Sequence, residues 1–254
     1  MSENSHFSQK APLEHVAEKL AEGKIATVEV HGTELPGHLS AATDAARETA
    51  VVLLLISAII ISLGLPHSHL LLILAIFSTG WALWKFGRSA WLGWSRLERL
   101  HRIVKQEKWE IDHNREQEKL ELKELYAAKG FEGKLLDNVV DVLMADGDRL
   151  LKVMVEEELG LKLESHEHPL KQASGAGLGA LLAAVLVLIC QWVAPNFYGY
   201  LIGGLLSIIG ASTLSAHYEQ NRMVPAIIWN IGLAILAYAW VYFLYHFFFY
   251  ILIR

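Results

Sequence analysis

Five long apolar runs restrict the folds that this chain can adopt. They lie at about residues 49–65, 69–94, 173–193, 198–216 and 225–248. A helix needs about 20 apolar residues to cross a bilayer, and the first run reaches that length with the helical turn before it. Inside a bilayer the backbone polar groups must bond within the chain, so runs of this length cross it as helices. The sequence therefore predicts an all-α, polytopic membrane protein with five transmembrane helices.

A polar, Glu-rich stretch separates the second apolar run from the third. The predicted organisation is a polar N-terminal arm over 1–40, transmembrane helices 1–2 over 41–94, a Glu-rich helical domain over 95–165 and transmembrane helices 3–5 over 166–254.

The distribution of Lys and Arg predicts the orientation. These residues gather before the first run and after the second, and Arg222 lies between the fourth and the fifth, whereas the connectors PHSH and APNFYG carry none. Positively charged loops stay in the cytoplasm, so the N-terminus and the Glu-rich domain are expected there and the C-terminus outside. The first residues, MSENSHFSQK, contain no apolar signal region, and a bacterial inner membrane is the expected location.

Composition argues against several classes of protein. The net charge of −5 gives no basic surface for nucleic acid. Cys190 is the single cysteine, which excludes a disulfide within one chain and is typical of a small buried apolar side chain. The chain has no nucleotide loop, HExxH motif or nucleophile elbow, so we expect neither an enzyme nor a bound cofactor.

Small residues recur in the last three runs. Gly175, Gly177 and Gly179 are spaced by two, and Gly199 precedes Gly203 by four. Such residues let helices approach closely. They predict either packing among the helices of one chain or a seam between two chains.

Four glutamates in the Glu-rich domain form two spaced pairs. Glu107 and Glu110 are three apart, as are Glu118 and Glu121, and the second pair follows the first by eleven residues. We predict one helix from 95 to 128, stopped near Gly130, on which all four carboxylates share a face. Like charges on one face repel unless a cation lies among them.

Two further helices are expected, over 132–144 and 148–159. On the second of them Met154 and Glu158 are four apart and share a face. Carboxylates bind divalent ions, and a thioether favours transition metals over Mg²⁺ or Ca²⁺. The alternative is that the glutamates form a solvated face and Met154 belongs to the core.

At this point the chain resembles the vacuolar iron transporter family. The resemblance rests on Glu107, the WEI motif at 109–111, ExxE at 118–121, ELY at 124–126, KG at 129–130 and the closing MVEEELGL. The number and order of the apolar runs, with a polar domain after the second, are also similar to that family.

The resemblance implies a homodimer in the lipid bilayer whose cytosolic helices bind several divalent ions. The implied metal ligands are Glu107, Glu110, Glu118, Glu121, Met154 and Glu158. The family often has two adjacent methionines on the third cytosolic helix, whereas here Val155 follows Met154.

The implied membrane ion path is altered. The first-run acid of the family corresponds to Glu48, the second-run glutamate to Phe77 and the second-run methionine to Lys85. Glu48 would contact the ion or exchange protons. Lys85 could pair with Glu48, or it could extend with Arg88 to the cytoplasmic interface.

The resemblance implies transport of a divalent metal, iron or manganese, out of the cytoplasm in exchange for protons. The alternative is a membrane-anchored metal-binding or interaction protein that does not transport, which the changes at Phe77 and Lys85 favour.

Overall fold

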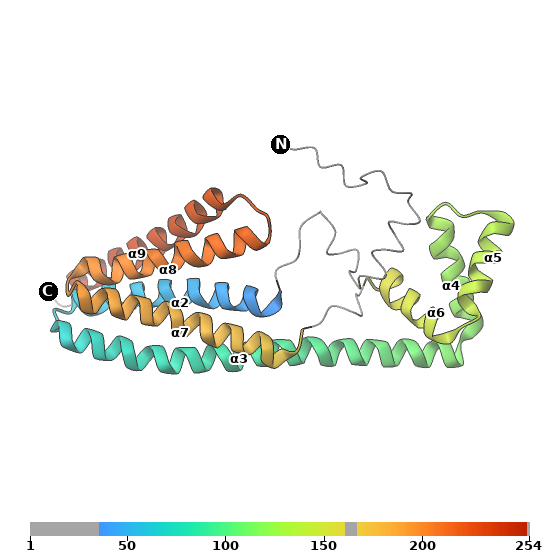
Figure 1. The fold of residues 1–254 in the computed structure, drawn as a ribbon, viewed down its shortest axis with the longest axis horizontal. Helices are drawn as coiled ribbons and strands as arrows, with labels where there is room; N and C mark the ends of the chain where they lie inside the picture. The colour runs from blue at the N-terminus through green and yellow to red at the C-terminus, as the bar shows by residue number, and fades with distance from the viewer. Residues whose placement is uncertain (1–35, 161–166, 253–254) are drawn as a thin grey trace, which may run out of the picture. The chain divides into compact units, whose positions relative to one another are not determined.

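The computed structural model describes residues 36–160 and 167–252, and the described part is helical throughout, without a strand (Figure 1). Of the predicted N-terminal arm over 1–40, only residues 36–40 lie within the described residues. Contacts divide the chain into two units, which are described separately below. The first unit contains residues up to Ala90 and from Pro169 onward, and the second runs from Trp91 to His168.

Five helices are long and apolar enough to cross a membrane, which confirms the predicted spans. They are α2 (Gly37–Ser62), α3 (His67–His113), α7 (Pro169–Val193), α8 (Phe197–Tyr218) and α9 (Met223–Leu252). Helix α3 extends well beyond its apolar part, because the polar sequence after Trp94 continues to form helix.

The first unit is packed around α2, which contacts α7, α8 and α9. The core includes Leu53 on α2, Leu74 on α3, Val187 on α7 and Ile208 on α8. Their burial excludes lipid and water from the centre of this unit and holds the apolar helices together.

Glycines bring α2 and α7 into very close contact. A Cβ atom on Gly175 would lie 2.1 Å from the carbonyl oxygen of His38, and one on Gly179 would lie 2.1 Å from that of Ala42. Only glycine fits at these two positions, one helical turn apart. Of the two predicted uses of the small residues, the structure shows packing within one chain at Gly175 and Gly179.

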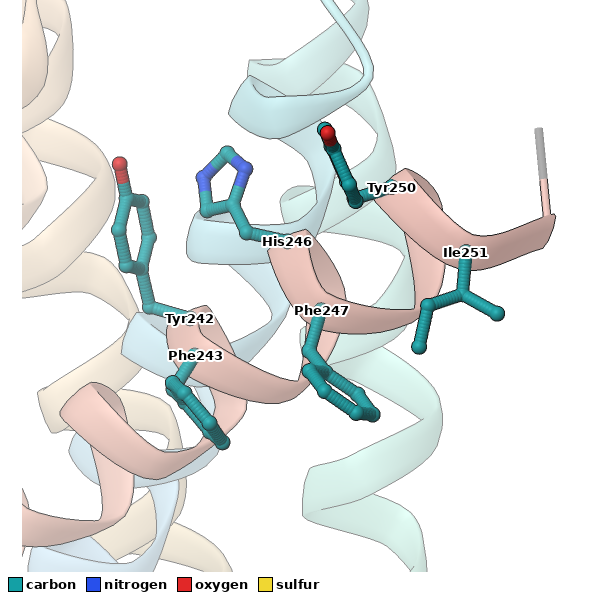
Figure 2. A pocket seen from close by; sticks show the side chains of 6 residues that line it. All are labelled: Tyr242, Phe243, His246, Phe247, Tyr250 and Ile251. Carbon is teal, nitrogen blue, oxygen red and sulfur yellow. The ribbon is translucent and has the colours of Figure 1, made fainter. Parts of the chain in front are cut away.

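Helix α9 has the least buried apolar surface among the five candidate spans. Near its C-terminus, Tyr242, His246 and Tyr250 form one row of side chains and Phe243, Phe247 and Ile251 form another, and the six line a shallow apolar pocket (Figure 2). An apolar aromatic surface of this kind is typical of a helix that faces lipid.

The second unit contains the end of α3 and four shorter helical segments. These are α4 (Arg115–Ala128), α5 (Gly133–Met144), α6 (Gly147–Val153) and a π-helical turn, η2 (Met154–Glu158). Their small core consists of Ile111, Leu122, Leu136, Val140, Leu150 and Met154.

The prediction of one continuous helix over 95–128 is wrong. Helix α3 ends at His113, Asn114 adopts a non-helical backbone (φ −124°, ψ 38°), and α4 begins at Arg115. Asn favours helix ends over helix interiors because its side chain competes with backbone hydrogen bonding. The two glutamate pairs therefore lie on two helices rather than along one.

Helices α4 and α5 are joined by exposed polar contacts. Lys119 pairs with Asp141 at 2.8 Å and Lys123 pairs with Asp137 at 2.7 Å. The hydrogen bonds within these pairs raise the pKa of Lys119 and lower the pKa of Asp137. Both pairs are exposed, so they orient the helices more than they stabilise them.

Candidate metal centre

Glutamates from α3, α4 and η2 lie close enough to influence one another's ionisation. The group consists of Glu107, Glu110, Glu118, Glu121 and Glu158, and we call it the glutamate cluster. The break at Asn114 turns α4 back toward the end of α3, so both predicted pairs contribute. The predicted carboxylates are thus neighbours in space, although they do not share one helix.

Two members of the glutamate cluster are buried. Glu107 is 6% exposed and Glu118 is 3% exposed. Burial, which penalises the charged form, is the largest cause that raises the pKa of each from 4.5 to about 7, and repulsion by the other carboxylates adds to it. Near neutral pH, a small change in pH or the arrival of a cation therefore changes their protonation.

Glu158 and one oxygen atom of Glu118 show related effects. Partial desolvation raises the pKa of Glu158, although this residue is exposed, and repulsion by Glu121 and Glu110 raises it further. The Oε2 atom of Glu118 is buried and accepts no hydrogen bond from the part of the chain that the structure describes. A buried, unpaired carboxylate oxygen is costly unless it is protonated or bound to a cation.

Two glutamines orient carboxylates of the cluster. The Gln106 amide donates to Glu110 at 3.0 Å, and the Gln117 amide donates to Glu121 at 2.7 Å. Neither glutamine was predicted from the sequence. The spacing in the sequence could have predicted both contacts, because each glutamine lies four residues before its glutamate on the same helix face.

An open pocket of about 360 Å³ adjoins the cluster. It is lined by Gln117, Leu120, Glu121, Glu124, Leu125 and Glu158. Three of these side chains are carboxylates, so a hydrated cation can reach the exposed side of the cluster from this pocket.

The π-helical turn determines which acid of the Glu156–Glu158 run faces the cluster. Glu157 is held elsewhere, since it forms an ion pair with Lys129 and lies 3.4 Å from the Tyr126 hydroxyl. Glu158 is the residue that interacts with Glu121 and Glu110. Single π-helical turns are frequent at functional sites, where they shift a side chain relative to the α-helical register.

Met154 is completely buried in the apolar core of the second unit, together with Leu122 and Leu150. The structure therefore shows Met154 in the apolar core, which was the alternative to a metal-binding role in the sequence analysis. Its role as a metal ligand stays a prediction.

Within residues 36–160 and 167–252, no three His, Cys, Asp or Glu side chains are arranged closely enough to hold a metal ion. The ligand roles of the glutamate cluster accordingly also stay predictions. What the structure shows is a concentration of negative charge that a cation would relieve.

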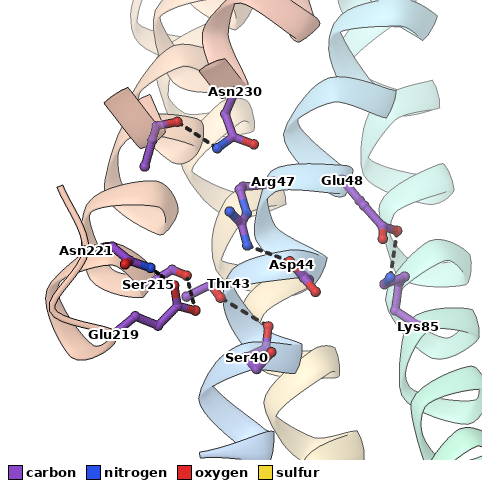
Figure 3. Close-up of polar contacts among 11 residues, drawn as sticks. Ser40, Thr43, Asp44, Arg47, Glu48, Lys85, Ser215, Glu219, Asn221 and Asn230 are labelled. Carbon is purple, nitrogen blue, oxygen red and sulfur yellow. Dashed lines mark hydrogen bonds and ion pairs between the residues drawn. The ribbon is translucent and has the colours of Figure 1, made fainter. Parts of the chain in front are cut away.

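The first unit contains a separate charged site between α2 and α3. The Lys85 ammonium donates to Glu48 at 2.6 Å, and on α2 itself Arg47 pairs with Asp44 at 2.5 Å (Figure 3). Of the two alternatives for Lys85, the structure shows pairing with Glu48. Phe77, at the position expected for a second acid, stacks against Trp81.

Comparison with protein-family models gives a match to the VIT family over residues 94–246. The match contains the glutamate cluster, α7, α8 and most of α9, whereas Glu48, Phe77 and Lys85 precede it. A comparison with curated proteins finds no match. Because the family match covers more than half of the 254 residues, the chain belongs to the VIT family of vacuolar iron transporters, and this membership indicates a multi-pass membrane protein that transports a metal ion.

Proposed function

We propose that this protein exports a divalent metal, Fe²⁺ or Mn²⁺, from the cytoplasm in exchange for protons. The glutamate cluster is the proposed site that collects the ion before it enters the membrane. The observation that carries the proposal is the pair of buried carboxyls, Glu107 and Glu118, within a group of five acids. Carboxylate oxygens suit Mn²⁺, and Glu-rich sites in helical bundles also bind iron.

Proton exchange is supported by the same residues. The pKa of both Glu107 and Glu118 is raised to about 7. A metal ion that binds them near neutral pH must displace protons, since carboxylates bind metal only when ionised. Metal and protons therefore compete for one site, as an antiporter requires.

The proposed arrangement places the N-terminus and the Glu-rich domain in the cytoplasm of a bacterial inner membrane, with the protein acting as a homodimer. The orientation rests on the distribution of Lys and Arg. The dimer and the role of Met154 as a sixth ligand rest on the family resemblance.

One observation favours the second candidate, a membrane-anchored metal-binding protein that does not transport. Glu48 is neutralised by Lys85 at 2.6 Å, and a fixed positive charge beside a path opposes the passage of cations. The Glu48 side chain nevertheless remains 51% exposed, so the ion pair does not seal it.

Flux through the reconstituted protein separates the two candidates. We expect wild-type protein in liposomes to carry Fe²⁺ and Mn²⁺, followed with an internal dye, and the Glu118→Gln/Glu121→Gln variant to lose at least about 90% of that flux, since these two carboxylates would collect the ion. Exchanging the exposed acids Asp112 and Glu116 for Asn and Gln removes the same charge and should leave the flux unchanged. Metal binding without flux in the wild type would establish the second candidate.

A further inference from the structure

Two neighbouring residues of α2 are joined to α3 by polar side chains. The Nζ atom of Lys85 donates to Glu48 at 2.6 Å, and the indole Nε1 atom of Trp81 donates to the Thr49 hydroxyl at 3.0 Å. Lys85 and Trp81 are four apart and therefore lie on one face of α3. Figure 3 shows Lys85 reaching from its helix to Glu48.

The ammonium group of this pair is the buried member. The Lys85 side chain is 8% exposed, whereas that of Glu48 is 51% exposed. A buried ammonium is stable only with a partner, and among the described residues the partner is Glu48. Lys85 therefore forms a direct, charge-assisted hydrogen bond with the Glu48 carboxylate.

Adjacent contacts fix the position of Lys85. Thr49 donates its own hydroxyl hydrogen to the Ala45 carbonyl at 2.6 Å and accepts from Trp81. The Trp81 ring also stacks against Phe77. These contacts restrict the turn of α3 that precedes Lys85. The Lys85 side chain therefore loses little further conformational entropy when it extends toward α2.

We propose that Lys85 is a tethered counter-ion of Glu48 that weakens the binding of divalent cations to this carboxylate. The inference rests on the proposed function, in which the transported ion would pass Glu48, the acid that the family resemblance places in the membrane path. A divalent ion that binds Glu48 must compete with the ammonium for the Oε2 atom. Displacing the ammonium costs a charge-assisted hydrogen bond and leaves a buried positive charge beside the metal.

The variant that tests the proposal is Lys85→Met. Methionine keeps a flexible, unbranched side chain in the buried space and removes only the charge. Arg88→Met is the matched control, because Arg88 lies on the same helix three residues later and is exposed. The charge exchange Glu48→Lys/Lys85→Glu keeps an ion pair between α2 and α3 and reports whether the pair itself is needed for folding.

The first readout does not depend on transport. A hydrophobic carbodiimide modifies carboxyl groups. The rate at which it labels Glu48 is followed by mass spectrometry as Mn²⁺ is added and is compared with the rate in the same protein without Mn²⁺. We expect Mn²⁺ to protect Glu48 in Lys85→Met at a concentration about ten- to a hundredfold lower than in wild type or Arg88→Met, the range that corresponds to one charge-assisted hydrogen bond. Equal protection in all three proteins, or no protection in Lys85→Met, would overturn the proposal.

The second readout is Mn²⁺ flux in liposomes, which distinguishes failure of this inference from failure of the proposed function. Faster flux in Lys85→Met than in wild type supports both. Equal flux in the two proteins, with equal protection of Glu48, contradicts the counter-ion role of Lys85 but agrees with the proposed transport function. Protection of Glu48 in Lys85→Met without flux in any variant supports the counter-ion and contradicts transport.

Discussion

Replacing Glu118 and Glu121 with Gln is expected to abolish the stabilisation of the protein by Mn²⁺. A ligand that binds only the folded state stabilises it by about 2.7 kcal/mol at a hundred times its dissociation constant. In the wild type this gain depends on carboxylates of the glutamate cluster, of which Glu118 is buried with an unpaired Oε2 atom. The double variant retains the shape of both side chains but cannot supply charged oxygen ligands.

The measurement is the thermal unfolding of detergent-solubilised protein with and without Mn²⁺ at pH 7.5. The double variant should unfold at the same temperature in both conditions, whereas the Asp112→Asn/Glu116→Gln control should respond to Mn²⁺ as the wild type does. If the glutamates only form a solvated face, the wild type will show no response to Mn²⁺, and the metal assignment is then wrong.

Without metal, the second unit is expected to lose stability as the pH rises from 5 to 7.5. The pKa of Glu107 and of Glu118 is about 7 in the folded protein, compared with 4.5 for a free glutamate. The folded state therefore binds more protons than the unfolded state between these values. The stability that protonation provides is complete below about pH 4.5 and is lost as the pH passes through 7, by about 2–4 kcal/mol for the two groups together.

Hydrogen exchange across α4, measured by mass spectrometry without metal, reports this loss locally. Exchange should accelerate with pH more than the intrinsic rate does. Glu118→Gln should flatten the dependence and protect α4 at pH 7.5, because it removes an unpaired buried charge. The exposed Glu116→Gln change should have no such effect. A pH-independent stability in the wild type would contradict the burial of these carboxyls as ionisable groups.

The spans were predictable because span formation depends on local properties. A run of about 20 apolar residues can cross a bilayer only as a helix, whatever its neighbours are. The helix from Pro169 to Val193 accordingly contains the predicted run 173–193. The helix from Gly37 to Ser62 contains most of the predicted run 49–65 but ends before its last three residues. Their polar ends were underestimated, since composition alone does not show where a helix continues beyond its apolar part.

The arrangement of the polar domain was less predictable because it depends on contacts distant in sequence. Periodicity favoured a single helix through Asn114. In the structure Ile111 on α3 and Leu122 on α4 belong to one buried core, and the turn at Asn114 allows this packing. The spacing of the glutamates selected acids that are neighbours in the structure, but the two pairs lie on two helices rather than on one. Met154 shared a face with Glu158 in the sequence, but the π-helical turn and the core of the second unit bury it.

The central claim, that the glutamate cluster is a metal site in competition with protons, is tested most directly by a Mn²⁺ titration of the wild-type protein, in which electron paramagnetic resonance measures the free ion. We expect binding at pH 7.5 and a dissociation constant about a hundredfold higher at pH 5, since a carboxyl with a pKa near 7 is then about 1% ionised. The absence of binding at pH 7.5, or an affinity that does not change between the two pH values, would contradict the claim.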